Sequence, residues 1–222
     1  MRDEDFDVFI EEFGEATHRV DVPLETLQKW RGRLPDLLLT YWAEEGWSGF
    51  ANGLFWIVDP DDYEDLVNEW LEDTLLEQID AFHVIARTAF GKLYVCGELT
   101  GVCMTISCPI NAVFALPENL TPKSTADRDW SVRSFVGLST SSCDLRDEAG
   151  TALFERAVAK LGPLEPDEVY GFEPAIVLGG KMLLDNLRRL KLDVHLTVLR
   201  QLAAPQLPFA AADLEQLLDR PK

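Results

Sequence analysis

With 222 residues, 47% of them hydrophobic, the chain is long enough to bury a core in one compact domain or two small ones. Its net charge of −19 at pH 7 is concentrated at the start: residues 1–80 contain 22 acidic and 5 basic residues, and residues 81–222 contain 17 and 15. An acidic surface repels nucleic acids and anionic membranes and attracts basic proteins, so this composition disfavours direct binding to DNA, RNA or a membrane surface.

Helical patterns dominate the chain up to Gly46. Apolar side chains recur there at helical spacing, and glycines and prolines mark the ends of the segments. The predicted elements are a helix over residues 6–13 that ends at Gly14, extended residues 18–22, a helix opened by Pro23 and a helix opened by Pro35.

A short strand and an acidic helix are predicted next. The stretch Gly53–Val58 is uncharged and dense in large side chains, which is typical of a buried strand. Asp59 can cap the following helix, and Pro60 suits its first helical position. Helical spacing predicts that the buried face of this helix consists of Tyr63, Leu66, Val67, Trp70, Leu71 and Leu75.

The other face of this helix carries Asn68 among acidic side chains and has no basic residue. Such a face is usually only solvated, but it can also dock a basic partner. Trp47, Phe50 and Trp70 could act as aromatic anchors, although aromatic side chains at these spacings more often belong to a core. The candidate partner-binding residues are Glu44, Glu45, Trp47, Asp59, Asp61, Asp62, Glu64, Asp65, Glu69, Glu72 and Asp73.

After Asp80 the pattern becomes two-fold and rich in β-branched residues. Hairpin turns at Gly91-Lys92 and Thr100-Gly101 separate the first three of four predicted strands, which cover residues 82–90, 93–99, 102–107 and 112–116. The 19 residues from Leu99 to Pro117 carry no charge, as a membrane span would. Their glycine, proline and polar residues fit two buried strands better, so we expect no transmembrane segment.

Helical patterns return after a polar stretch, Pro117–Asp129, which is the best candidate for a linker. Helices are predicted over residues 130–138, 151–161, 182–202 and 210–218, with an irregular segment at 164–180. This order predicts an α+β fold in which a mainly antiparallel sheet is flanked by N-terminal and C-terminal helical layers. The expected domains are residues 1–116 and 130–202, followed by an extension over 203–222.

No complete catalytic or metal-binding motif is present. The three histidines are not part of HExxH or of a zinc-type spacing with cysteine. Gly179-Gly180-Lys181 lacks the first glycine of a phosphate-binding loop, and Ser139–Ser142 lacks the GxSxG pattern. We therefore predict no catalytic residue, no metal and no cofactor. A Cys–His pair whose members meet only in the folded chain stays an alternative.

The cysteines and the first residues of the sequence favour a cytoplasmic protein. Cys96, Cys103, Cys108 and Cys143 show no CxxC pairing, and the first residues, MRDEDFDVF, lack the basic and apolar regions of a signal peptide. Buried reduced thiols in a cytoplasmic protein are the simplest interpretation.

Two parts of the sequence resemble known families. FGEATHRVDVP, LPDLLLTYWAEEGWSGFANGLFWIVDP and YEDLVNEWL are similar to the GAD-like domain. The stretch from Gly150 to Leu202 resembles the C-terminal domain of Tdi-type immunity proteins, and the positions that match it are Leu153-Phe154, Leu161-Gly162, Asp167-Glu168, Tyr170-Gly171-Phe172, Pro174-Ala175, Leu178-Gly179-Gly180 and Asn186-Leu187. Together the two resemblances extend from about Phe6 to Leu202.

Proteins with this pair of domains are immunity proteins of type VI secretion systems. The resemblance implies a non-enzymatic cytoplasmic inhibitor that binds and silences a cognate toxin, commonly a DNase. A DNase cleft must be basic to bind DNA, and an acidic surface complements such a cleft. The alternatives are a general protein-interaction or regulatory module and an enzyme with an unrecognised site. The sequence leaves the oligomeric state open.

Overall fold

The structure is a computed structural model that describes residues 2–209. Within these residues one antiparallel sheet contains, in spatial order, β1 (Thr17–Val20), β2 (Trp47–Phe50), β3 (Phe55–Ile57), β4 (Phe82–Thr88), β5 (Lys92–Gly97), β6 (Gly101–Ser107) and β7 (Ala112–Ala115). A small separate sheet pairs β8 (Glu168–Phe172) with β9 (Leu187–Lys191). The helices are α1 (Glu4–Phe13), α2 (Leu24–Trp30), α3 (Asp36–Glu45), α4 (Glu64–Leu71), α5 (Thr125–Val136), α6 (Thr140–Cys143), α7 (Phe154–Leu161) and α8 (Leu192–Leu202).

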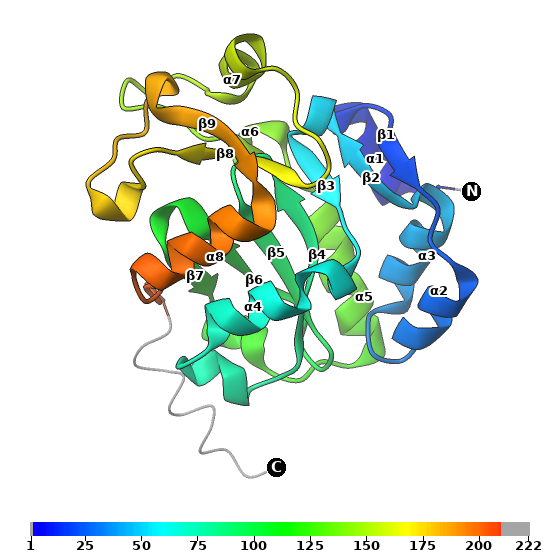
Figure 1. The fold of residues 1–222 in the computed structure, drawn as a ribbon. Coiled ribbons are helices and arrows are strands. Elements are labelled where there is room, and N and C mark those ends of the chain that lie inside the picture. Colours follow the sequence, from blue (N-terminus) through cyan, green and yellow to red (C-terminus); the bar gives the residue numbers. More distant parts are fainter. Residues whose placement is uncertain (1, 210–222) are drawn as a thin grey trace.

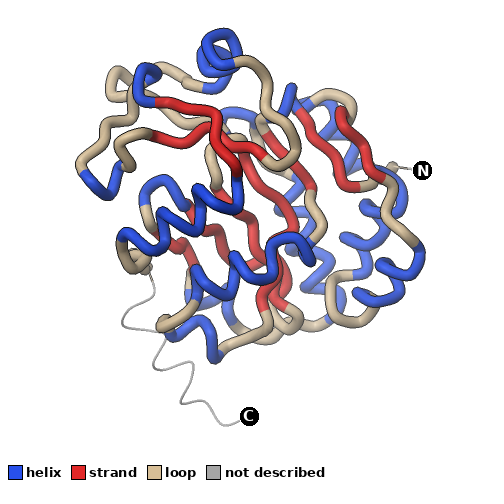
Figure 2. The backbone as a smooth tube through the Cα atoms, in the orientation of Figure 1, coloured by secondary structure: helices blue, strands red, loops and turns tan. Residues whose placement is uncertain are grey.

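Helices cover both faces of the large sheet, which confirms the predicted α+β class. On one face, α1, α3 and α5 bury a core that includes Phe9, Trp42 and Phe135. On the other face, α4 and α8 lie side by side and bury Trp70 and Leu196. Figure 1 shows α4 and α8 in front of the sheet and α5 behind it. The strands lie between these helices in Figure 2.

The meander from β4 to β7 follows the predicted strands closely. Gly91 and Gly101 adopt positive φ angles of 77° and 67° at the two hairpin turns, a conformation that glycine takes without a Cβ clash. The uncharged stretch from Leu99 to Pro117 contains β6 and β7, as predicted. None of the helices among residues 2–209 is long and apolar enough to cross a membrane.

The predicted helix over residues 182–202 is wrong in its first half. Only Leu192–Leu202 is α-helical, because residues 187–191 form β9, which pairs with β8, and Leu184–Asn186 forms a 3₁₀ turn. The leucine spacing there fits a helix as well as a strand, and only the pairing with Glu168–Phe172 selects the strand. Trp47–Phe50 forms β2 between β1 and β3, a strand that is not predicted from the sequence. The helix predicted over residues 210–218 lies outside the described residues.

The polar stretch before Trp130 is only partly a loop. Ser124 caps α5 by accepting a hydrogen bond from the Asp127 N–H, and the helix begins at Thr125. The Ser131 hydroxyl accepts a hydrogen bond from the Val102 N–H of β6, with an N–O distance of 2.9 Å. The first helix of the C-terminal region therefore packs directly on the sheet formed by the N-terminal region.

Candidate functional site

The acidic helix begins as its sequence predicts. The Asp59 carboxylate accepts a hydrogen bond from the Asp61 N–H at 3.1 Å, and Pro60 occupies the first position of a short 3₁₀ turn that leads into α4. Burial raises the pKa of Asp59, and the hydrogen bond from Asp61 opposes that shift. Asp59 is half-buried, so its main role is to cap the start of the helix, and it contributes little to the exposed acidic surface.

One face of α4 is packed against the sheet and α8. Tyr63, Leu66, Val67, Trp70 and Leu71 are buried, which confirms their predicted place in the core. Leu75, predicted on the same face, lies in the 3₁₀ turn after α4 and is only half-buried. The Trp70 indole N–H donates a hydrogen bond to the backbone carbonyl of Leu196 in α8 at 3.2 Å. This packing fixes the orientation of the helix and turns its acidic face away from the core.

A residue from α8 provides hydrogen-bond donors to the backbone carbonyls at the C-terminal end of α4. The Arg200 guanidinium donates hydrogen bonds to the backbone carbonyls of Glu69 and Glu72, both at 2.9 Å. A cation at the C-terminus of a helix pairs with free carbonyls and with the negative end of the helix dipole. The Gln201 side chain also donates to the Glu69 carboxylate at 3.2 Å. Helix α8 therefore supports α4 from one side. The sequence of α4 alone does not predict this contact.

The predicted site residues of this segment differ in their exposure. Glu69 is half-buried and bonded to α8. The Asp61 carboxylate forms an ion pair with Lys29 of α2, with an N–O distance of 2.6 Å. The remaining acidic residues are exposed and together define the acidic face of α4: Asp62, Glu64, Asp65, Glu72 and Asp73.

The structure does not bring the other three predicted site residues to this face. Glu45 is 5% exposed, and its carboxylate pairs with Arg2 at 2.7 Å. Glu44 and Trp47 are half-buried, and Trp47 packs with the core of the opposite sheet face. These residues are close to Asp59 in sequence, but the sheet separates them from α4. Glu44, Glu45 and Trp47 therefore do not belong to the acidic face of α4.

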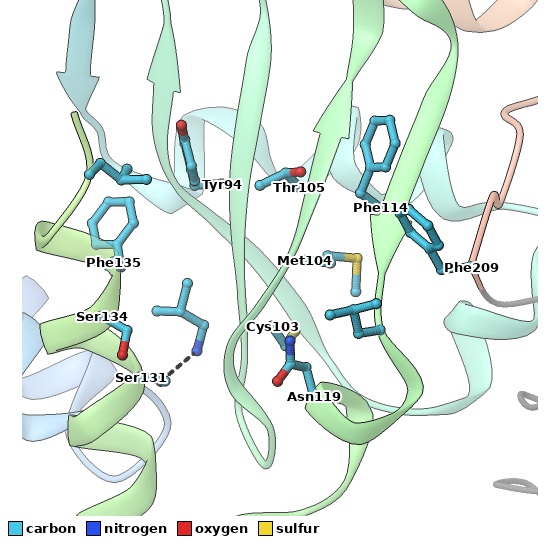
Figure 3. Close-up of a pocket in the computed structure, with 13 residues that line it drawn as sticks. Tyr94, Cys103, Met104, Thr105, Phe114, Asn119, Ser131, Ser134, Phe135 and Phe209 are labelled. Atoms are coloured by element: carbon cyan, nitrogen blue, oxygen red, sulfur yellow. Dashed lines mark hydrogen bonds between the residues drawn. The ribbon is translucent and has the colours of Figure 1, made fainter. Parts of the chain in front are cut away.

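An apolar pocket of about 470 Å³ lies between α5 and strands β5 to β7. Figure 3 shows Tyr94, Phe114, Phe135 and Phe209 around it, with Ser131 at its edge. Its lining contains no carboxylate, lysine, arginine or histidine. Burial raises the pKa of the Cys103 thiol to about 11, so the thiol stays protonated at neutral pH. This pocket offers apolar surface rather than the titratable groups of general acid–base catalysis.

The cysteines and the other possible metal ligands among residues 2–209 do not form a reactive site either. Among the described residues, no three His, Cys, Asp or Glu side chains converge in a way that could hold a metal ion. The predicted buried free thiols are confirmed for Cys96, Cys103, Cys108 and Cys143. Burial raises the pKa of each of these thiols. Buried neutral thiols behave as small apolar side chains.

A surface that concentrates acidic side chains attracts basic protein surfaces. Comparison with known proteins specifies the class. Residues 4–110 match the family model of the GAD-like domain, and residues 129–203 match that of the T6SS immunity protein Tdi1, C-terminal. These two matches are the ones that the resemblance predicted. This family match supports a type VI secretion immunity protein.

The fold is similar to that in a crystal structure of Atu4351 from Agrobacterium tumefaciens. The TM-score is 0.80 at 22% sequence identity, and the match covers 92% of this chain and 90% of that one. At this identity the likeness shows the fold alone. No curated protein matches the sequence.

Proposed function

We propose that the protein binds and neutralises a cognate type VI secretion toxin, a DNase, in the cytoplasm of the cell that makes both. In this function the protein acts by occupying its partner and performs no chemistry. Residues 1–116 and 130–202 act as the two domains of one inhibitor. The observation that carries the proposal is the acidic face of α4, held in place by α8.

The charge on this face is largely uncompensated. The sequence contains no lysine or arginine between Arg33 and Arg87. Arg87 itself is fully buried, with its guanidinium 4.8 Å from the Trp56 ring and bonded to the Pro166 carbonyl at 2.6 Å. Lys29 reaches Asp61, and Arg200 of α8 bonds to the backbone carbonyls of Glu69 and Glu72, so the acidic side chains of this segment outnumber the cations beside them. A strong negative field therefore extends from α4 into solvent.

A DNase supplies the matching surface. Its cleft must attract a polyanion, so it concentrates lysine and arginine where DNA binds. An acidic inhibitor is steered to that cleft and competes with DNA for the same basic groups.

The test is co-expression with the cognate toxin, for which the product of the neighbouring gene is the first candidate. We expect the two proteins to co-elute and the complex to leave DNA intact, whereas the toxin alone degrades it. The purified protein alone, incubated with the same DNA, controls for nuclease activity of its own. Undiminished DNA cleavage at an excess of this protein would contradict the proposal.

A further inference from the structure

Helix α8 exposes a row of apolar side chains. Val194, Val198 and Leu202 are 60%, 44% and 39% exposed. Their spacing of four residues places them on one side of the helix. The side that faces the sheet is already filled by Leu192, Leu196 and Leu199, which are buried. The row is thus a second apolar side of α8, and residues 2–209 provide nothing that buries it.

Two short turns extend this row. The 3₁₀ turns Cys108–Ile110 and Ile176–Leu178 contact α8 and each other. They add further exposed apolar side chains beside the row. We call the whole set the apolar patch, and it consists of Ile110, Val177, Leu178, Val194, Val198 and Leu202. A group of exposed apolar side chains of this kind marks an interaction site more often than scattered single ones do.

The acidic face of α4 borders the apolar patch. On α8, Arg200 and Gln201 point toward α4 and bond to Glu69. Val194 and Val198 precede Gln201 by seven and three residues, so helical geometry places them beside Gln201, on the side of α8 that is turned away from Arg200. Figure 1 shows α4 and α8 side by side on the same face of the molecule. Apolar and acidic surfaces are therefore neighbours. The acidic face and Ile110 lie within the match to the GAD-like domain, and the rest of the apolar patch lies within the C-terminal match.

We infer that the apolar patch and the acidic face of α4 form one docking surface, and that its occupant is the toxin of the proposed function, on which this inference rests. The partner surface that fits it has an apolar centre flanked by lysine and arginine side chains. This composition matches the usual anatomy of a protein interface, which has an apolar centre and a polar rim. Charge complementarity selects a basic partner over a second copy of this chain, because two acidic faces repel each other.

The two parts of the surface have separable kinetic roles. Charges on the rim accelerate encounter through their long-range field, so they set the association rate. Apolar side chains act only after contact, by excluding water from a packed interface, so they set the dissociation rate. The apolar patch is therefore expected to control how long the complex lives.

The experiment compares full-length variants in binding to the toxin by surface plasmon resonance. The test variant is Val194→Gln/Val198→Gln, which keeps charge and helix propensity but makes the row polar. The matched control is Val8→Gln, a helical valine that is 57% exposed on α1, behind the opposite sheet face. We expect the test variant to dissociate about tenfold faster or more, with an association rate within about twofold of wild type, and the control to be unchanged.

The outcomes separate this inference from the proposed function. No binding by the wild-type protein would overturn the proposed function and, with it, this inference. Wild-type binding with an unchanged dissociation rate for Val194→Gln/Val198→Gln would overturn the inference alone.

Two other possible occupants of the apolar patch are tested on the free protein. Self-association that the variant abolishes in ultracentrifugation would assign the patch to a second copy. A melting temperature lowered far more than in Val8→Gln would mean that the chain itself covers the patch.

Discussion

The indole N–H of Trp70 donates a hydrogen bond to the carbonyl of Leu196 across the contact between α4 and α8. Trp70 lies within the match to the GAD-like domain, and Leu196 lies within the match to the immunity C-terminal domain. The acidic face of α4 is thus held by a residue pair that spans both domains. Preorganisation of this kind lowers the cost of ordering a surface when a partner binds.

Replacing Trp70 should separate packing from hydrogen bonding. Trp70→Ala removes a fully buried indole, and we expect a loss of about 3–5 kcal/mol in the free energy of unfolding. Trp70→Phe keeps most of the apolar contact and removes only the indole hydrogen bond to the Leu196 carbonyl, so the expected loss is smaller. Urea denaturation followed by circular dichroism measures both. A Trp70→Ala variant as stable as wild type would mean that α4 is not anchored through this side chain.

Arg200 should stabilise the end of α4. Arg200→Met keeps the aliphatic stem and removes the two donors to the Glu69 and Glu72 carbonyls. We expect a loss of about 1–2 kcal/mol, since each bond has a charged donor but is partly exposed to water. Hydrogen exchange should show faster opening of the last turn of α4. Arg19→Met, which removes an exposed ion pair with Asp21, is the control and should change stability little.

Charge reversal on α4 should slow association with the toxin. In the variant Asp62→Lys/Asp65→Lys/Glu72→Lys, each changed side chain is exposed, so the fold should persist. We expect the stopped-flow association rate to fall and its dependence on salt to weaken, because the steering field is reduced.

The control for this variant carries the same change in net charge elsewhere. Glu4, Asp7 and Glu11 are exposed on α1, across the sheet from α4, and are replaced by lysine. If both triple variants associate equally fast, the effect belongs to net charge and the acidic face has no special role. If the α4 variant equals wild type, that face is only solvated.

The stability of the protein should fall as pH drops from 7 to 5. Burial lowers the pKa of His83, against a smaller raising effect of Glu98, and burial also lowers the pKa of His195. The unfolded chain therefore binds protons in this range that the folded chain does not, so protonation favours unfolding. The double variant His83→Gln/His195→Gln should show a shallower slope of unfolding free energy against pH.

The two family domains should unfold together. Arg87 of β4 donates a hydrogen bond to the Pro166 carbonyl, and Ser131 of α5 accepts one from Val102 of β6. Such contacts couple the domains through a shared core, so we expect one calorimetric transition with equal calorimetric and van't Hoff enthalpies. Two transitions assignable to the two domains would show that they fold independently.

Local sequence patterns predicted the elements whose signals lie within a few residues. Asp59 and Pro60 start a helix wherever they precede a helical apolar pattern, and the apolar face from Tyr63 to Leu71 is buried as its spacing indicates. The hairpins at Gly91 and Gly101 follow from the need for positive φ. The α+β class and the resemblance to two families were likewise available from sequence.

The tertiary structure decided what depends on distant partners. Residues 187–191 became a strand because β8 offered backbone groups for pairing, although their leucines suit a helix. Glu45 left the candidate surface because Arg2, far away in sequence, pairs with it. The exposure of the apolar patch on α8 depends most strongly on the tertiary structure. Its leucine-rich sequence predicts a buried helix, and only the arrangement of the sheet, α4 and the neighbouring turns determines which of its sides meets solvent.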